Sequence, residues 1–312
     1  MTTVISKATT AEKRRRTGQR SGVAAARPGF VWALPAVLFF TLFAIIPLIL
    51  VFVLSFTQWD GLSDPTFVGL DKWKELADDP VMLQGLWLSV LLTVLSVAVQ
   101  TPTSIVLGVW AAGPQRNRAV LSAIYFVPLL LSVAAIALLW HTFLDPNFGV
   151  PAYATWLFGD GNLFGHQSTA IAVLVFVGAW QYTPFHALIY QGAARAIPRT
   201  LYEAAEIDGA GRIRTFFKIT LPLLRTSMIT SVIIQVVGGM TVFDSVLILT
   251  KGGPGTDTKI TAYYMYEKAF KSYDYGGSAV IATLLVVMAT IISLVMVKLS
   301  GYDKMRSTQE GV

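Results

Sequence analysis

The sequence predicts an all-α polytopic membrane protein with six transmembrane helices. Hydrophobic residues make up 54% of the chain and charged residues only 13%, whereas globular proteins carry about 25% charged residues. Six windows of 18 to 27 residues contain no Asp, Glu, Lys, Arg or His, and a helix of this length crosses ~30 Å of hydrocarbon. These observations exclude a soluble enzyme. The six windows are 31–56, 86–112, 119–140, 167–185, 226–243 and 275–297.

The distribution of Lys and Arg predicts the orientation of these helices. If the N-terminus lies in the cytoplasm, 18 of the 24 Lys and Arg residues fall on the cytoplasmic side. This bias is the positive-inside signal, so we expect both termini in the cytoplasm. The net charge of +6 follows from this topology, and we expect no nucleic-acid partner.

The same reasoning divides the chain into three parts. Residues 1–29 form a disordered basic cytoplasmic tail whose run Lys13-Arg14-Arg15-Arg16 is suited to contact with anionic membrane lipid. Residues 30–300 form the six-helix membrane domain, and residues 301–312 form a cytoplasmic C-terminal tail.

The connections between the windows have distinct compositions. The acidic loop 57–85 is expected outside, with a short helix near Asp71–Ala77. Residues 113–118 are a tight cytoplasmic hairpin. The loop 143–166 mixes Gly and Pro with aromatic residues and predicts a structured lid at the outer interface. A further outer loop, 251–274, begins with Gly and Pro.

The sequence lacks the residues and motifs of several kinds of chemical site. The chain has no cysteine, which excludes disulfides, thiolate metal sites and cysteine nucleophiles. His141 and His166 form no recognisable metal-ligand spacing with carboxylates. No G-x-x-x-x-G-K-[ST] phosphate loop occurs. We therefore expect no catalytic residue, no metal and no cofactor in this chain.

The cytoplasmic segment 195–224 carries the most specific pattern. Thr200 and Glu203 stand three residues apart, as in a capping box, so a helix is predicted to begin at Thr200. Gly209 can adopt the left-handed conformation that ends a helix. We interpret residues 200–208 as a short helix that projects rigidly into the cytosol; the alternative is a surface helix resting on lipid headgroups.

The next stretch has an amphipathic period. Four residues at i, i+3, i+4 and i+7 share one face, while Arg214 and Lys218 share another, which is typical of a helix at the membrane interface. Pro222 is expected to end it. The four residues are Ile213, Phe216, Phe217 and Thr220.

Three segments resemble a known family. Glu203-Ala-Ala-x-x-Asp208-Gly209-Ala210, followed by Phe217-x-Ile219-x-Leu221-Pro222-Leu223-Leu224, resembles the EAA loop of integral-membrane subunits of binding-protein-dependent ABC importers. Phe67-Val68-Gly69-Leu70-Asp71-Lys72-Trp73 and Leu249-Thr250-Lys251-Gly252-Gly253-Pro254 resemble the sugar-importer branch, in particular its MalF-like subunits. The resemblance runs from about Phe30 to Lys298.

The resemblance implies a fold, partners and a division of labour. The fold would be that of type I ABC importer permeases, and the location would be the inner (plasma) membrane of a bacterial cell. The projecting helix would be the coupling helix, seated on an ATPase dimer that binds ATP and Mg. The other partners would be a second, MalG-like permease subunit and an extracytoplasmic solute-binding protein. The coupling positions are Tyr202, Glu203, Ala204, Ala205, Asp208, Gly209 and Ala210.

The resemblance also implies solute-binding positions in the fourth and fifth windows. Glutamines, glycines and aromatic rings there suit sugar hydroxyls and C–H faces, although the same residues can serve helix packing alone. Asp244 has two open roles, accepting sugar hydroxyls or forming an ion pair at an outer gate. His186 is interpreted as a packing histidine. The implied positions are Gln181, Tyr182, Phe185, Gln235, Gly239 and Val242, and two of these, Gly239 and Val242, depart from the polar pattern of the family.

The expected function is therefore uptake of a sugar, a di- or oligosaccharide, by a permease subunit whose alternating access is driven by a separate ATPase. A permease for a non-sugar solute such as glycerol phosphate is an alternative. However, an anionic solute favours a cationic residue facing the cavity, and none lies in the six windows. A stand-alone secondary transporter would show buried ionisable relays or inverted repeats. A membrane-embedded enzyme would need a catalytic motif within the windows, and we find none.

Overall fold

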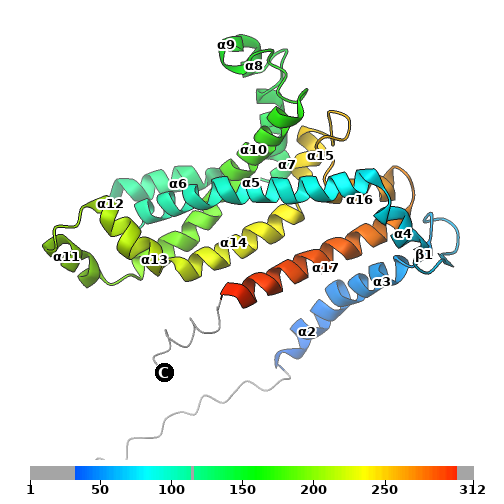
Figure 1. The fold of residues 1–312 in the computed structure, drawn as a ribbon, viewed down its shortest axis with the longest axis horizontal. Coiled ribbons are helices and arrows are strands. Elements are labelled where there is room, and N and C mark those ends of the chain that lie inside the picture. The colour runs from blue at the N-terminus through cyan, green and yellow to red at the C-terminus, as the bar shows by residue number, and fades with distance from the viewer. Residues whose placement is uncertain (1–31, 114–115, 301–312) are drawn as a thin grey trace, which may run out of the picture. The chain divides into compact units, whose positions relative to one another are not determined.

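The computed structural model describes residues 32–113 and 116–300, and most of them are helical (Figure 1). The predicted tails 1–29 and 301–312 lie outside the described residues. The chain divides into two compact units, residues 1–50 and residues 51–312. The described part of the first unit is one apolar helical run, α2 (Leu34–Phe40) and η2 (Thr41–Ile45) followed by the start of α3 (Ile46–Leu54). Its hydrophobic window buries no residue inside the protein.

Four described helical segments are long and apolar enough to cross a membrane. They are Leu34–Leu54, α5 (Pro80–Ala111), α10 (Gln167–Arg195) and residues Tyr275–Lys298 of α17 (Tyr275–Ser300). The number rises to six if each of two bent helix pairs counts as one span. The predicted helical membrane fold is confirmed at this level, while the count of six and the cytoplasmic position of both termini stay predictions.

The third predicted helix, 119–140, is not straight. It consists of α6 (Arg116–Leu130) and α7 (Val133–Phe143), which meet at a bend of 96°. Ser132 has an extended backbone and its hydroxyl accepts a hydrogen bond from the Ala135 N–H at 3.2 Å. Because a serine in this conformation caps a new helix, the apolar window contains a helix start that hydrophobicity alone does not reveal.

The fifth predicted helix, 226–243, also differs. The helix α14 (Arg225–Met240) ends before the window does, and α15 (Asp244–Leu249) begins after three non-helical residues. Before α14, the segments α12 (Arg212–Thr215), η3 (Phe216–Thr220) and α13 (Leu221–Leu223) form a helix bent by 68° against it. The prediction that Thr226–Phe243 is one continuous helix is therefore wrong.

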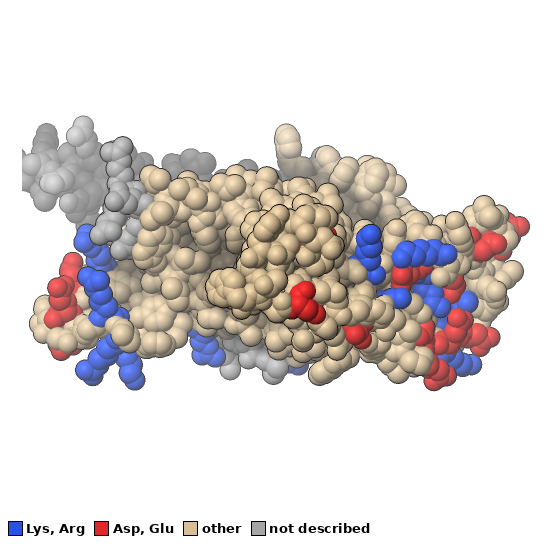
Figure 2. All heavy atoms as spheres, turned by 90° about the horizontal axis from the view of Figure 1, so that it is seen from above, with Lys and Arg blue, Asp and Glu red and all other residues tan. Residues whose placement is uncertain are grey.

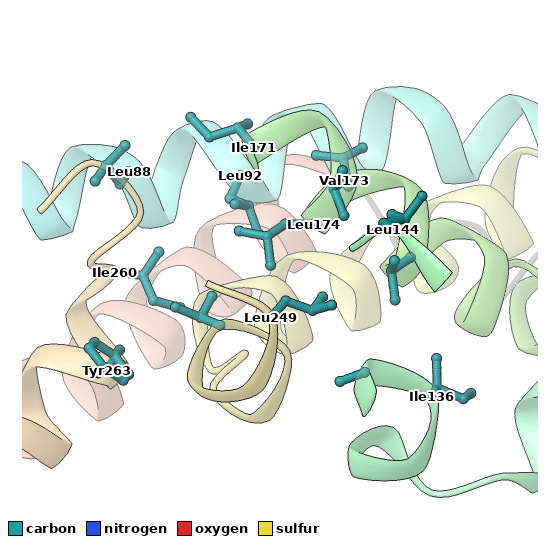
Figure 3. Packing of buried hydrophobic residues seen from close by; sticks show 14 residues of the cluster. Leu88, Leu92, Ile136, Leu144, Ile171, Val173, Leu174, Leu249, Ile260 and Tyr263 are labelled. Carbon is teal, nitrogen blue, oxygen red and sulfur yellow. The ribbon is translucent and has the colours of Figure 1, made fainter. Parts of the chain in front are cut away.

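The second unit is organised around the packing of α5 against α10. Gly108 lies at the closest approach, because a Cβ there would stand 2.5 Å from the Ala187 carbonyl oxygen. Apolar side chains from α5, α7, α10, α15 and α16 (Thr261–Phe270) form the main core (Figure 3). A second cluster joins α4 (Asp71–Ala77), α16 and α17. The core of this unit thus lies where α5 and α10 meet the segment that follows α14.

Two connecting segments are built as the sequence indicates. The helix α4 has the predicted bounds Asp71–Ala77, and it follows a two-stranded antiparallel ribbon of β1 (Thr57–Gln58) and β2 (Thr66–Phe67). The loop 143–166 contains α8 (Val150–Tyr153) and α9 (Thr155–Phe158), so it is structured. Its place at a membrane interface stays a prediction.

Candidate functional site

A cavity of about 460 Å³ lies where α14 ends and α15 begins, between α5 and α10. Ligand pockets typically occupy about 300–1,000 Å³, so this volume suits a small solute. Six of the seven solute positions named from the sequence line it, and they come from two helices and the break between α14 and α15. They are Tyr182, Phe185, Gln235, Gly239, Val242 and Asp244.

The break that shapes this cavity has a local cause. The Thr241 hydroxyl donates to the carbonyl oxygens of Val237 at 3.0 Å and Gly238 at 3.3 Å, and such back-bonding competes with the helical ladder. Phe243 then leaves the helical region with φ −140° and ψ −55°. As a result Asp244 starts a new helix, with its side chain exposed and without an ion pair to any described residue.

Gly239 has a packing role as well as a place in the cavity wall. A Cβ at this position would lie 2.8 Å from Oγ1 of Thr93 on α5, closer than real contacts allow. Gly239 therefore both lines the cavity and forms a close-packing contact. A larger side chain at this position would push α14 away from α5 and alter the cavity.

A chain of buried polar side chains joins three helices at one side of the cavity. The Thr101 hydroxyl donates to Oε1 of Gln235 at 3.2 Å, and Nε2 of Gln235 donates to Oγ of Ser231 at 3.2 Å. Oγ of Ser231 lies 2.9 Å from Nδ1 of His186. In addition, the Ser104 hydroxyl donates to the Thr183 carbonyl at 3.2 Å. These bonds connect α5, α10 and α14, and they give His186 a partner within the protein.

Gln181 is the position that the structure separates from the others. Its side chain is only 2% exposed and does not line the cavity. Its Nε2 donates to the Leu131 carbonyl at 3.5 Å, and its Oε1 has no hydrogen-bond partner among the described residues. The bend between α6 and α7 leaves this carbonyl free to accept, which explains why the amide points there.

The cavity also contains polar residues that the sequence pattern did not single out. Ser96 and Gln100 of α5 line it, one helical turn apart. Their i, i+4 spacing within an otherwise apolar window is a visible signal. The family resemblance does not point to them, because it concerns the fourth and fifth windows.

The segment 195–224 contains the short helix α11 (Arg199–Ile207), which Figure 1 shows at one end of the ribbon, beyond α12. Its C-terminus matches the prediction: Gly209 has φ +72°. The Gly209 N–H donates to Glu206 O at 3.0 Å and the Ala210 N–H to Ala205 O at 2.8 Å. This pair of bonds is the Schellman motif.

The N-terminus of α11 does not match. The helix begins at Arg199, and its N-cap Pro198 makes no side-chain cap. Thr200 already lies within the first turn, so the capping box of Thr200 and Glu203 is wrong. Pro198 explains the earlier start, because its fixed φ of −58° with an extended ψ of 132° puts the chain directly before a helix.

The coupling positions lie at different depths around α11. Glu203, Ala204, Asp208 and Gly209 are exposed, Tyr202 and Ala210 are half-buried, and Ala205 is buried. Oη of Tyr202 lies 3.1 Å from Oγ1 of Thr220 on η3. A hollow of about 910 Å³ separates α11 from the ends of α5 and α10. The helix therefore projects, and the bond between Tyr202 and Thr220 is the one hydrogen bond found between side chains of α11 and η3 in the described residues.

The stretch after α11 is only partly amphipathic as predicted. Ile213 and Phe217 are exposed, but Thr220 is buried and Phe216 packs against a core cluster of Ile105, Tyr190 and Leu224. A π-helix at Phe216–Thr220 rotates side chains away from the 3.6-residue period. Two of the four residues of the predicted interfacial face thus turn toward the protein.

The opposite end of the second unit carries a network of ion pairs, around α4 and α16. Lys72 bridges Glu75 at 2.9 Å and Asp274 at 3.4 Å. Glu267 bridges Lys259 at 2.6 Å and Lys271 at 2.9 Å. Figure 2 shows charged side chains gathered toward both ends of the view and mostly uncharged surface between them. This pattern suits a protein whose middle lies in hydrocarbon.

Two carboxyl groups near this network titrate below their ordinary range. Burial alone would raise the pKa of Asp79, but hydrogen bonds from Tyr264 and from the Val81 and Met82 N–H groups lower it overall. Burial would likewise raise the pKa of Glu267, and the two lysines outweigh that effect and lower it. In the described part of the chain, no group of three or more His, Asp or Glu residues could hold a metal ion.

Comparison with known proteins places these features in a family. Residues 104–301 match the family of the binding-protein-dependent transport system inner membrane component. The chain is 33% identical to the probable ABC transporter permease protein YurN of Bacillus subtilis, over 86% of this chain and 94% of that protein. It is 30% identical to the multiple sugar-binding transport system permease protein MsmF of Streptococcus mutans, over 83% and 93%.

A solved structure shares the fold. A chain of the bacterial ABC transporter that imports the acidic polysaccharide alginate aligns with a TM-score of 0.76 and 22% identity, covering 87% of this chain and 94% of that one. The family match and the two related permeases confirm the resemblance to importer permeases that the sequence indicated.

Proposed function

The chain belongs to the family of binding-protein-dependent transport system inner membrane components, and on this premise we propose that it is the sugar-conducting permease subunit of an ATP-driven importer. The topology would have six spans, with each bent helix pair crossing once and both termini in the cytoplasm. The observation that carries the proposal is the cavity at the break between α14 and α15, where polar and aromatic side chains of three helices converge.

The cargo we propose is a neutral di- or oligosaccharide. Tyr182 and Phe185 offer ring faces for sugar C–H surfaces, while Gln235 and Thr241 offer groups for hydroxyls. Related permeases bear names that refer to sugars, including diacetylchitobiose for NgcF of Streptomyces coelicolor and arabinooligosaccharides for AraP of Bacillus subtilis.

Charge in the cavity argues against an anionic cargo. None of the described residues that line it is Lys or Arg, and its one acid is Asp244. An unpaired carboxylate repels phosphate and uronate groups, whereas anion sites use Arg or Lys. We therefore disfavour glycerol phosphate, and alginate-like acidic sugars, as the cargo of this chain.

The driving force would enter through α11. We propose that Tyr202, Glu203, Ala204, Ala205, Asp208, Gly209 and Ala210 form the seat of one subunit of an ATPase dimer, which binds ATP and Mg. The helix lies between α10 and the α12–α14 segment in the chain. Its displacement would tilt the helices that wall the cavity, and this motion would alternate access between the two sides. A second, MalG-like permease subunit and an extracytoplasmic solute-binding protein would complete the importer in the cell membrane.

The test uses the importer assembled from this chain and its partner subunits in proteoliposomes. We expect neutral saccharides such as maltotriose, xylobiose, arabinotriose or diacetylchitobiose, presented with the binding protein, to stimulate ATP hydrolysis and to accumulate inside. An alginate trisaccharide should have no such effect. The chain reconstituted alone, without ATPase, should carry none of these sugars. Uptake by the chain alone would instead support a stand-alone secondary transporter, and stimulation only by the acidic sugar would overturn the proposed cargo.

A further inference from the structure

Gln100 carries a side-chain amide that lies on the wall of the cavity. It lies on α5, two helical turns from Leu92 and one from Ser96, and all three residues line the cavity. Only 7% of its surface is exposed, and neither atom of its amide makes a hydrogen bond to a side chain or backbone group among the residues that the structure describes.

The other glutamines of the neighbouring helices behave differently. Gln235 donates to Ser231, Gln191 donates to the Ala111 carbonyl at 2.9 Å, and Gln181 donates to the Leu131 carbonyl. Among the described residues, the amide of Gln100 is not one of the polar groups that are sealed from solvent without a partner, and lipid offers no hydrogen bond to it. The accessible face of Gln100 opens to the cavity, so a group that enters the cavity is its available partner.

The backbone around Gln100 is held firmly. The next residue, Thr101, bonds to Gln235 on α14, and Ser104 bonds to the Thr183 carbonyl on α10. One turn further, Ile105 packs with Tyr190 and Leu224 in an apolar cluster. Gln100 thus lines the cavity next to the contacts that hold α5, α10 and α14 together.

We propose that Gln100 is the amide that binds the sugar at the α5 wall of the cavity, in place of Gln181. This inference rests on the proposed function as a sugar permease. A primary amide offers two donors and an acceptor, which match a pair of adjacent hydroxyl groups. With the Ser96 hydroxyl one turn away and no cation among the described residues of the cavity wall, the site suits neutral sugar rings. Sugar seated there touches α5 at the turn that also bonds α14 and α10.

The decisive experiment compares cysteine variants, and the chain suits it because it has no native cysteine. Q100C, Q181C and F185C are made singly in the full-length chain within the assembled importer. The variants are treated in proteoliposomes with a positively charged, water-soluble methanethiosulfonate reagent. We expect Q100C and F185C to be modified at least about tenfold faster than Q181C, whose side chain is sealed at the α6–α7 bend.

Protection by sugar supplies the second readout. The saccharide that slows modification of F185C identifies the cargo, and we expect it to slow Q100C to a similar degree. Modification of Q181C as fast as Q100C, or a sugar that protects F185C but leaves Q100C unprotected, overturns the assignment of Gln100. If none of the neutral saccharides protects F185C, the proposed function fails, while the relative rates still test where Gln100 points.

Substitution of single glutamines by leucine tests whether Gln100 contributes to sugar uptake. Q100L should raise the sugar concentration needed for half-maximal uptake about tenfold, and Q100N, which keeps the amide, should recover part of that loss. Q181L and the matched control Q191L should change this concentration less than about twofold. Equal effects of Q100L and Q181L, with equal protein levels, would assign the site to both glutamines and contradict the proposal.

Discussion

The two charged ends of the second unit differ in how their charged side chains are paired. Around α4 and α16, lysines and carboxylates pair in a network that includes Lys72, Glu267 and Asp274. Around α11, none of the ion pairs found in the described residues involves an arginine, and the helix is tied to its neighbour mainly through Tyr202 and Thr220. Among the described residues, the first end is therefore cross-linked by ion pairs and the second is not, as expected if force enters at the second end only.

The largest effect on the α11 end is expected from a substitution of Gly209. The G209V variant places a β-branched residue at φ +72°, which costs roughly 1–2 kcal/mol or more and disrupts the end of α11. We expect ATP-driven uptake to fall at least about tenfold while the amount of protein in the membrane is unchanged. E203A should act similarly. The measurement is sugar uptake normalised to membrane protein.

The matched control for this variant is G211V. Gly211 has φ −66°, and a Cβ added there would meet open space, so valine fits without strain. Normal uptake in G211V together with lost uptake in G209V supports the role of the left-handed turn. Full uptake in both G209V and E203A contradicts a coupling role for α11.

The tie between α11 and η3 gives the next largest effect. Y202F removes the hydroxyl that contacts Thr220 and should weaken this tie by about 0.5–1.5 kcal/mol. We expect more ATP to be hydrolysed per sugar imported, because part of the displacement of α11 no longer reaches η3. T220V should have the same effect, and the double variant should be no worse than either single one. Additive losses would show that the two hydroxyls act separately.

Substitutions in the ion-pair network around α4 and α16 should lower the free energy of unfolding and leave the ATP hydrolysed per imported sugar unchanged. Glu267 is 17% exposed and lies between two lysines. E267Q leaves both ammonium groups with a weaker partner, and we expect about 1–3 kcal/mol of destabilisation with little change in ATP hydrolysed per sugar. Thermal unfolding in detergent measures it. The control D71N removes an exposed pair, Asp71 with Lys74, and should change stability by less than about 0.5 kcal/mol.

The smallest effect concerns pH. Asp79 and Glu267 have lower pKa values in the folded protein than their ordinary values. They therefore stabilise the fold above the usual carboxyl range, and this stability is lost as pH falls through about 4 toward their folded pKa values. We expect the melting temperature to be flat from about pH 8 to about pH 5 and to drop below about pH 4.

Y264F should reduce this drop, because it removes a hydrogen bond that favours the charged form of Asp79. The control Y273F alters an exposed tyrosine and should leave the pH profile unchanged. A profile that is identical in Y264F and the unmodified protein would show that Asp79 does not contribute.

The sequence was a good guide where short-range physics decides the structure. Helix α4 has the predicted bounds, and Gly209 closes α11 as expected. It was a poor guide at the helix breaks. Helix α7 begins after Ser132 and helix α14 ends at Met240, and both boundaries lie inside an uncharged apolar window. Hydrophobicity does not reveal them, because the sequence is equally apolar on both sides of each break.

For the cavity, the family pattern identified the segments that contribute to its wall but not the directions in which individual side chains point. Tyr182 and Phe185 line the cavity while Gln181, their neighbour, points to the α6–α7 bend. Gln100 lies two windows away in sequence and faces the same space. Successive residues of a helix point about 100° apart, so one residue of difference decides which partner an amide meets.

Hydrophobic windows and one left-handed glycine were enough to predict a helical membrane protein with a projecting helix, because each reflects the interaction of a residue with lipid or with its own backbone. Which polar side chains meet in the cavity was decided only in three dimensions. The bend after α6, the break after α14 and the close approach of α5 to α10 bring distant segments together. Those contacts depend on packing between helices, which local sequence does not encode.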